Sequence, residues 1–178
     1  MNHPVPPAAL RPRRPFPAEL FAALQAAFGE RVSASEAVRA HHGRDESPFD
    51  PQLPDAVVFA QSTEDVRTAV ELCARHDVPI IPYGNGSSLE GQLLAVEGGV
   101  TIDLSGMNRI LSVAAEDMTA TVQAGVSRKT LNDALRHTGL FFPIDPGADA
   151  RLGGMSATRA SGTNDVRYGT MREKVLGL

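Results

Sequence analysis

The chain has 178 residues, of which 42% are hydrophobic and 21% are charged. These values are ordinary for a globular protein and indicate neither disorder nor a membrane-spanning segment. With 17 basic and 21 acidic residues the net charge is −4, the wrong sign for a surface that neutralises nucleic-acid phosphates, so we expect no nucleic-acid partner. The length allows one good hydrophobic core or two small lobes, but it is short for two full domains.

The N-terminal part of the chain predicts an irregular lead-in and then one helix. Residues 1–16 are rich in proline and arginine and lack the apolar stretch of a secretory signal, so we expect a cytoplasmic location. A peripheral association with the inner membrane would leave no trace in the sequence and stays open. The helix is predicted between Pro17, near its start, and Gly29, at its stop. Its apolar positions are Leu20, Phe21, Leu24 and Phe28.

From residue 54 onward the pattern predicts strands alternating with helices. The apolar run at 56–60 predicts a strand, and Ser62 with Asp65 three positions later predicts the capped start of a helix. The apolar face of that helix is formed by Val66, Ala69, Val70 and Cys73. Residues 80–81 predict the next strand. Such a unit implies a parallel pair, and ligands collect beyond the carboxyl ends of parallel strands.

The middle of the chain predicts further strands and a second helix. The strands are expected at 100–104, 110–114 and 119–123, and their spacing by turn-forming residues is typical of antiparallel pairing. The helix is expected from about Ser127 to His137, with Gly139 as a left-handed C-terminal cap. Its inward-facing residues are Leu131, Ala134 and Leu135.

A glycine-rich loop follows the second predicted strand, at the end where a ligand is expected. Its sequence from Tyr83 to Gly91 is YGNGSSLEG. The dinucleotide pattern G-x-G-x-x-G would need glycine in place of Leu89, and a Walker loop would need a lysine followed by Ser or Thr, so both are excluded. The small residues 84–88 can turn several backbone N–H groups inward and so bind an anion such as a pyrophosphate. The alternative is an ordinary turn at the end of a strand, which happens to consist of small residues and binds nothing.

A second stretch of small residues lies much further along the chain. Residues 152–163 read LGGMSATRASGT, and further glycines stand at Gly147 and Gly169. This density indicates backbone packed closely against another group. Since we expect this stretch to have no bulky side chains to pack, it predicts a second wall, and two such walls indicate a long ligand between them.

Other polar residues are assigned structural roles. His41 and His42 point apart in any regular structure, so we expect a solvated pair and no metal site, within a polar stretch at 41–48 that covers a surface or lines a cleft. Asp145 is expected to form a turn, and the single cysteine, Cys73, to lie in the core. Arginines expected at the surface rather than as substrate ligands are Arg151, Arg159, Arg167 and Arg172.

Three stretches of the sequence resemble one known flavoprotein family. They read YGNGSSLEG, TLNDALRHTGLFFPIDPGADARLGGMSATRASGT and RYGTMREKVLGL. They are similar to the D-lactate dehydrogenase/glycolate oxidase flavoproteins of the vanillyl-alcohol oxidase superfamily, and the similarity runs from Ala34 to Leu178. The resemblance implies an α+β fold, in which a small parallel α/β lobe precedes a mainly antiparallel α+β lobe that is truncated at its C-terminus. We expect an N-terminal extension and helical segment at residues 1–53 and an incomplete FAD-binding domain at residues 54–178.

The resemblance also implies a cofactor, FAD in an extended conformation, with its pyrophosphate cradled by the loop at residues 84–88. Some relatives attach the flavin covalently through a histidine in this loop; residues 83–91 contain none, so we expect non-covalent FAD. The residues expected to contact FAD are Pro82, Gly84, Asn85, Gly86, Ser87, Ser88, Leu89, Gly91, Pro146, Gly147, Ala148, Leu152, Gly153, Gly154, Ser156, Ala157, Thr158, Ser161 and Gly162.

The activity implied by the resemblance is that of a D-2-hydroxyacid dehydrogenase. A hydride would pass from C2 of D-lactate, glycolate or D-2-hydroxyglutarate to flavin N5, and electrons would go on to a cytochrome, a quinone or a partner subunit. In the family, the positions that bind the substrate carboxylate and a metal lie in a C-terminal domain with no counterpart here. Catalytic residues therefore stay unassigned, and we expect a fragment with little activity alone. A non-catalytic flavin-binding remnant is the alternative.

Overall fold

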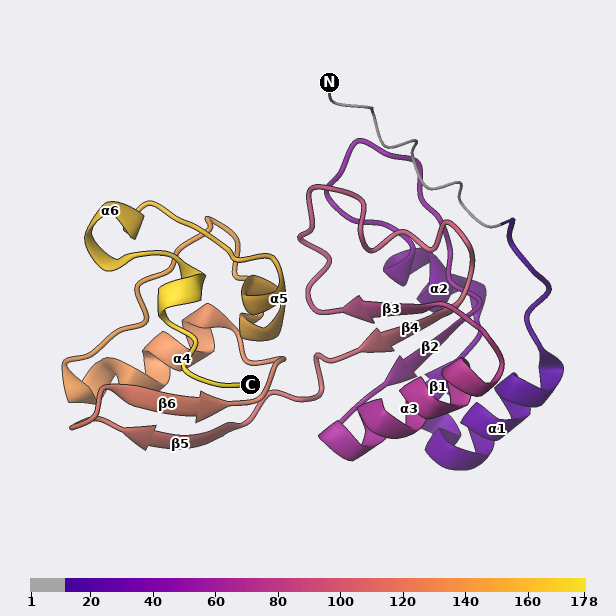
Figure 1. Ribbon diagram of the computed structural model, residues 1–178, viewed down its shortest axis with the longest axis horizontal. Helices are drawn as coiled ribbons and strands as arrows, with labels where there is room; N and C mark the ends of the chain where they lie inside the picture. The colour runs from indigo at the N-terminus through magenta and orange to yellow at the C-terminus, as the bar shows by residue number, and fades with distance from the viewer. Residues whose placement is uncertain (1–11) are drawn as a thin grey trace, which may run out of the picture.

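The computed structural model describes residues 12–178, so most of the predicted lead-in lies outside the described part of the chain. Two lobes lie side by side along the long axis (Figure 1). The first contains α1 (Ala18–Phe28), β1 (Val32–Ser33), α2 (Glu36–His42), β2 (Ala56–Phe59), α3 (Thr63–Arg75), β3 (Ile80–Tyr83) and β4 (Val100–Asp103). The second contains β5 (Ile110–Ala114), β6 (Thr119–Val122), α4 (Arg128–Leu135), α5 (Leu152–Ala157) and α6 (Asp165–Tyr168). Short 3₁₀ turns lie at Gly29–Arg31, Arg136–Thr138 and Met171–Glu173.

The sheet of the first lobe has the strand order β1-β2-β4-β3, and β2 and β3 both run parallel to β4. The prediction that β2 and β3 are parallel is confirmed, although β4 lies between them. The expectation that the strand at 100–104 pairs antiparallel is wrong. Its alternating sequence resembles a half-exposed strand, but all of Val100–Asp103 is buried, because β4 is the central strand and is covered on both faces.

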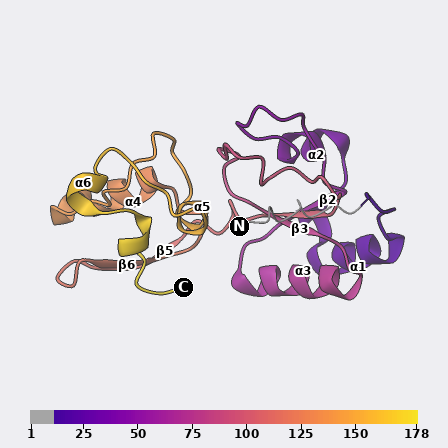
Figure 2. The ribbon, with the colours of Figure 1, turned by 45° about the horizontal axis from the view of Figure 1, so that its top comes forward.

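Two helices cover one face of this sheet and α2 lies on the other (Figure 2). The helix predicted between Pro17 and Gly29 is confirmed as α1. Three of its predicted apolar positions, Leu20, Leu24 and Phe28, are buried. The side chain of Ser62 caps α3, as predicted, by accepting a hydrogen bond from the N–H of Asp65. The prediction that Val70 lies on the buried face of α3 is wrong. This residue is 40% exposed, because the buried stripe of the helix is narrow.

The core of the first lobe joins α1 and α3 to the sheet. Its buried residues are Leu20, Leu24, Phe28, Val32, Val58, Ala60, Ala69, Cys73, Val100, Ile102 and Met107. Val32 also pairs with Val58 in the sheet, so the segment before residue 54 packs as part of this lobe. A division of the chain at residue 54 remains a prediction.

The second lobe is built on a hairpin and a capped helix. Strands β5 and β6 pair antiparallel, as predicted. Ser127 caps α4 by accepting from the N–H of Thr130, and Gly139 adopts the expected left-handed conformation with φ 74°. Leu131 and Leu135 are buried, but Ala134, expected to face inward, is exposed because the short helix buries a single row of side chains.

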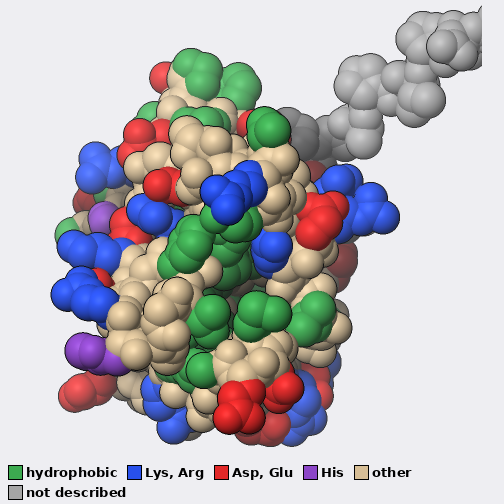
Figure 3. Space-filling model, turned by 90° about the vertical axis from the view of Figure 1, so that its left-hand side faces the viewer, with side chains coloured by type: hydrophobic (Ala, Val, Ile, Leu, Met, Phe, Trp, Pro, Cys, Tyr) green, Lys and Arg blue, Asp and Glu red, His purple; other side chains and the backbone are tan. Residues whose placement is uncertain are grey.

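A second, separate core holds this lobe together. Its buried residues are Val126, Leu131, Leu135, Ile144, Leu152, Met155 and Met171. Outside it, hydrophobic side chains gather around a hollow at the end of the lobe (Figure 3). Large hydrophobic residues of this lobe that remain exposed are Leu111, Val113, Met118, Phe141, Val166, Leu176 and Leu178. Hydrophobic surface gathered in this way is typical of an interaction surface rather than of an isolated domain.

The single cysteine provides a test of the first core. Cys73 is fully buried, as predicted, and burial raises the pKa of its thiol to about 11. We therefore expect the native protein not to react with a thiol reagent such as DTNB at mildly alkaline pH, because the thiolate is rare and inaccessible. Absorbance of the released thiol measures this, and protein in guanidinium is the control. Stoichiometric labelling of native protein would contradict the packing of α3 on the sheet.

Candidate functional site

The loop after β3 presents backbone donors at the carboxyl edge of the parallel sheet. It begins beside Asp103, because Tyr83 is the register partner of that residue. Within the described part of the chain, the backbone N–H groups of residues 84–88 donate to no protein acceptor. A row of free N–H groups in a turn of small residues is a typical anion-binding arrangement. The predicted loop therefore has the chemistry that a pyrophosphate requires.

One glycine of the loop is required by geometry. Gly86 has φ 72°, in the left-handed region, and a Cβ added to it would lie 2.6 Å from the hydroxyl oxygen of Tyr83. Both the conformation and the contact exclude a side chain. Gly84 is different, because a Cβ there would meet the Arg151 side chain at 3.4 Å, an ordinary packing distance.

Polar side chains around the loop fit a ligand with several oxygens. Ser88 is fixed through its backbone, since its carbonyl accepts from the N–H of Glu46 at 2.9 Å. Its hydroxyl is buried and has no hydrogen-bond partner, and the same holds for the hydroxyl of Ser47 in the neighbouring segment. Buried hydroxyls without partners cost about 1–3 kcal/mol each, so a ligand or ordered water has to satisfy them. Free N–H groups and unpaired hydroxyls fit the phosphate oxygens of FAD.

The second glycine-rich stretch is shaped mainly by packing within its own lobe. Leu152 and Met155 are buried in the second core, so the expectation that the stretch has no bulky side chains to pack is wrong. A Cβ on Gly153 would lie 2.6 Å from Cβ of Ala124, and a Cβ on Gly162 would overlap the backbone of Asp145. No side chain fits at these two positions, because atoms of the same lobe, mostly backbone, lie against them. Whether the stretch also contacts FAD stays a prediction.

The structure brings the loop against the segment that immediately precedes the second glycine-rich stretch. The side-chain amide of Asn85 donates to the carbonyl of Asp149 at 3.4 Å, and Gly84 lies against Arg151. The loop therefore touches the start of α5, where the two lobes meet, as Figure 1 also shows. This junction is the candidate site.

The remaining predicted contact residues differ in their exposure and in their hydrogen bonds. Ser87 and Gly91 are partly buried. The exposed residues are Pro82, Leu89, Pro146, Gly147, Ala148, Gly154, Ala157 and Ser161. The hydroxyls of Ser156 and Thr158 donate to carbonyls of α5 itself. Asp145 forms the predicted turn, accepting from the N–H of Gly147.

Three arginines are at the surface as expected, but Arg151 is not. Arg159, Arg167 and Arg172 are exposed. Arg151 is partly buried at the junction, where one terminal nitrogen donates to the carbonyl of Gly125 at 3.1 Å and Nε is buried without a partner. Its position beside Gly84 depends on the meeting of the lobes, which the sequence does not reveal.

The paired histidines also correct an expectation, because they are not a solvated pair. His41 is exposed, but His42 is buried and its Nε2 lies 2.9 Å from Oδ2 of Asp103. Burial alone would raise the pKa of Asp103, but hydrogen bonds from His42 and Ser105 outweigh it and hold that pKa below its ordinary value. Burial and the charge of Asp103 together raise the pKa of Tyr83. The carboxyl edge of the sheet therefore contains a buried histidine–carboxylate contact that sequence reasoning missed.

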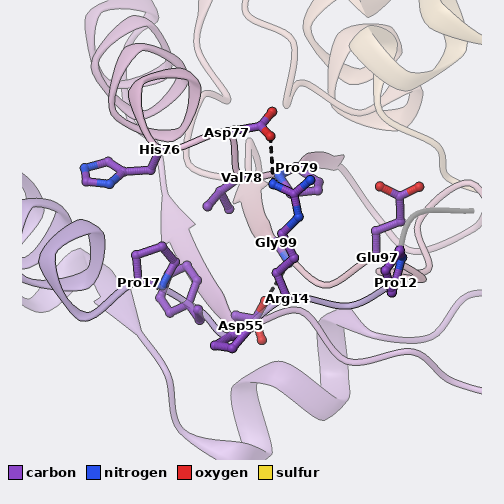
Figure 4. A pocket seen from close by; sticks show the side chains of 12 residues that line it. Pro12, Arg14, Pro17, Asp55, His76, Asp77, Val78, Pro79, Glu97 and Gly99 are labelled. Carbon is purple, nitrogen blue, oxygen red and sulfur yellow. Dashed lines mark hydrogen bonds and ion pairs between the residues drawn. The ribbon is translucent and has the colours of Figure 1, made fainter.

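A cavity elsewhere in the first lobe does not compete with this site. It lies where residues 12–17 cross the amino ends of β3 and β4, with a volume of about 60 Å³ (Figure 4). Arg14 pairs with Asp77 across it at 2.9 Å. Small-molecule sites have volumes of roughly 300 Å³ or more, so this cavity is too small for a cofactor. Across residues 12–178, no group of three or more potential metal-ligating side chains occurs, and no helix is long and apolar enough to span a membrane.

Comparisons with known proteins agree with this geometry. A family profile described as "FAD binding domain" matches residues 54–178. A probable mitochondrial D-lactate dehydrogenase of Danio rerio is 54% identical over 149 residues, which cover 84% of this chain and 30% of that protein. The chain thus spans less than a third of that relative's length.

Solved structures agree on the fold. An alkyldihydroxyacetonephosphate synthase superposes with a TM-score of 0.82 and 29% identity, over 94% of this chain and 33% of that one. p-Cresol methylhydroxylase superposes with a TM-score of 0.65 and 23% identity, over 80% of this chain and 29% of that one, which supports the fold alone. The fold predicted from the resemblance is confirmed. The chain belongs to the FAD binding domain family, of the vanillyl-alcohol oxidase type, and its cofactor is FAD.

Proposed function

We propose that this chain is the FAD-binding part of an oxidoreductase that acts on D-2-hydroxy acids, and that residues 84–88 hold the FAD pyrophosphate. The observation that carries the site is the row of backbone N–H groups without acceptors at the carboxyl edge of β3. The unpaired hydroxyl of Ser88 supports it. Since backbone dipoles bind anions without a cationic side chain, this nest suits a pyrophosphate in a chain of net charge −4.

The residues of this chain would bind and orient the cofactor. Gly86 gives the loop its turn, and the contacts of Gly84 and Asn85 with residues 149–151 fix the loop against the second lobe. Bound FAD would supply the hydride acceptor, its N5 atom, for oxidation at C2 of the substrate. Binding would be non-covalent, because residues 83–91 contain neither histidine nor cysteine.

The substrate class comes from the relatives. The Danio rerio protein that is 54% identical is named a probable D-lactate dehydrogenase, so D-lactate is the first substrate to test. Glycolate and D-2-hydroxyglutarate are the other members of the class. Electrons would pass on to a cytochrome, a quinone or a partner subunit.

A flavin-binding protein without turnover is the second candidate, and one observation favours it. Oxidation of a 2-hydroxy acid needs a cation that holds the substrate carboxylate. The structure places Arg151 against the loop, but its guanidinium already donates to the carbonyl of Gly125.

The first prediction concerns the binding of FAD itself. Quenching of flavin fluorescence on titration with protein should give saturable binding of FAD and much weaker binding of riboflavin, because riboflavin lacks the phosphates that the N–H groups of residues 84–88 would hold. Equal affinity for the two flavins would contradict the assignment of the loop to the pyrophosphate.

The second prediction separates the loop from general stability. Gly86→Ala should weaken FAD binding about tenfold or more, because its methyl group meets the Tyr83 hydroxyl and displaces the N–H groups. Gly139→Ala is the matched control, since Gly139 has a similar φ of 74° but no atom within 4 Å of an added Cβ. Each substitution should lower the free energy of unfolding by about 1 kcal/mol from backbone strain. Equal FAD affinity in the two variants would count against the loop.

The third prediction distinguishes the two candidate functions. The FAD-loaded chain is mixed anaerobically with D-lactate, glycolate or D-2-hydroxyglutarate while the visible flavin absorbance is followed. We expect dithionite to bleach the flavin and the hydroxy acids to leave it unchanged, because the guanidinium of Arg151, which lies against the loop, already donates to the carbonyl of Gly125. Bleaching by D-lactate would establish that this chain carries a substrate site.

A further inference from the structure

His42 joins α2 to the carboxyl ends of the parallel strands. Its side chain is 4% exposed, and Nε2 contacts Asp103, the last residue of β4. Its ring centre lies 4.4 Å from that of Tyr83, the last residue of β3, and 5.7 Å from that of Phe59, the last residue of β2. One side chain therefore contacts the end of every parallel strand in the sheet.

Both ring nitrogens of His42 face hydrogen-bond acceptors. Nδ1 lies 2.8 Å from the carbonyl oxygen of Val38, which can only accept, so Nδ1 carries a hydrogen. On the other side, Nε2 lies 2.9 Å from Oδ2 of Asp103. Polar contacts therefore hold the ring of His42 at both of its nitrogens.

Tyr83 connects the His42–Asp103 contact to the loop. Its ring packs on that of His42, and its hydroxyl lies 3.5 Å from Nε2 of His41. Gly86 lies directly against the same hydroxyl, in the middle of the segment with free N–H groups. Because protein interiors are closely packed, a shift of Tyr83 has to move Gly86 or leave a gap beneath it.

Stability alone does not account for a buried histidine–carboxylate contact at this position. The cost of removing polar and charged groups from water offsets much of their attraction, so apolar side chains of similar volume often stabilise a core equally well. Two directional contacts, of His42 with Val38 and with Asp103, instead fix the position of this side chain. A fixed side chain matters because Tyr83 packs on it.

We propose that His42 is a positioning residue for FAD binding, which acts through Tyr83 on Gly86 and the N–H groups of the loop. The inference rests on the proposed function, since it takes residues 84–88 to hold the pyrophosphate. It makes the affinity for FAD depend on a side chain that does not touch the cofactor.

The test compares His42→Gln with a matched core variant. His42→Gln can keep only one of the two bonds, because its amide oxygen cannot bond to the oxygen of a carbonyl or carboxylate, so we expect FAD to bind about tenfold more weakly. Cys73→Ala is the control, because Cys73 is buried in α3 on the opposite face of the sheet and should lower stability while leaving FAD affinity unchanged. The measurements are the FAD dissociation constant and the urea midpoint of unfolding.

A double variant tests whether the two hydrogen bonds of residue 42 are what position the loop. In His42→Gln/Asp103→Asn, the glutamine amide can donate to Val38 and accept from the new asparagine, which can still accept from the N–H of Ser105. We expect this pair to restore most of the FAD affinity that His42→Gln loses. Rescue of stability without rescue of affinity would contradict the positioning role.

Tyrosine fluorescence gives a direct readout of the connecting residue. The chain has no tryptophan and two tyrosines, so in a Tyr168→Phe background Tyr83 is the sole tyrosine. Tyr168 packs on Phe141 in the second lobe, away from the loop. We expect His42→Gln to change the Tyr83 emission and its quenching by FAD, and Cys73→Ala to change neither.

The outcomes separate this inference from the proposed function. If the wild-type chain binds no FAD, the proposed function is wrong. If the wild type binds FAD and folded His42→Gln binds it equally well, the positioning role of His42 is wrong. Should His42→Gln not fold, Tyr83→Phe takes its place, because it removes only the hydroxyl beneath Gly86; unchanged FAD affinity in that variant would equally overturn the inference.

Discussion

The insertion of β4 between β2 and β3 is the constraint on which the rest of the structure depends. Parallel strands end at one edge of a sheet, so the segments that follow Phe59, Tyr83 and Asp103 leave the sheet side by side. The central position also buries Asp103, and a buried carboxylate needs a partner. His42 on α2 is that partner. The place of the loop and the chemistry beneath it therefore follow from one strand.

The glycines of the two predicted walls are required for different physical reasons. Gly86 has to be glycine because of its backbone conformation and the Tyr83 hydroxyl beside it. Gly153 and Gly162 have to be glycine because backbone or Cβ atoms of their own lobe lie against them. High glycine density thus has two physical causes here, of which only the first is tied to the row of free N–H groups. A sequence pattern does not separate these causes, because both remove the side chain.

The electrostatics of the site depend on the backbone more than on charged side chains. The chain carries a net charge of −4, yet its loop offers free N–H groups to an anion. Arg151 lies beside the loop, but its guanidinium is engaged with Gly125 and holds the start of α5. An anion site of this kind depends on the shape of the loop, so packing beneath the loop affects binding as directly as a charged contact would.

The sequence by itself determined the local elements and the family. The caps at Ser62 and Ser127, the buried rows of α1 and the small residues of the loop follow from rules that act over a few residues. The resemblance of the flavin-binding motifs to those of a known family identified the cofactor. Only the tertiary structure decided which strand is central, that His42 is buried against Asp103, and that Arg151 meets Gly84. Each of these contacts joins residues far apart in the chain, and neither periodicity nor spacing carries information about which distant segments meet.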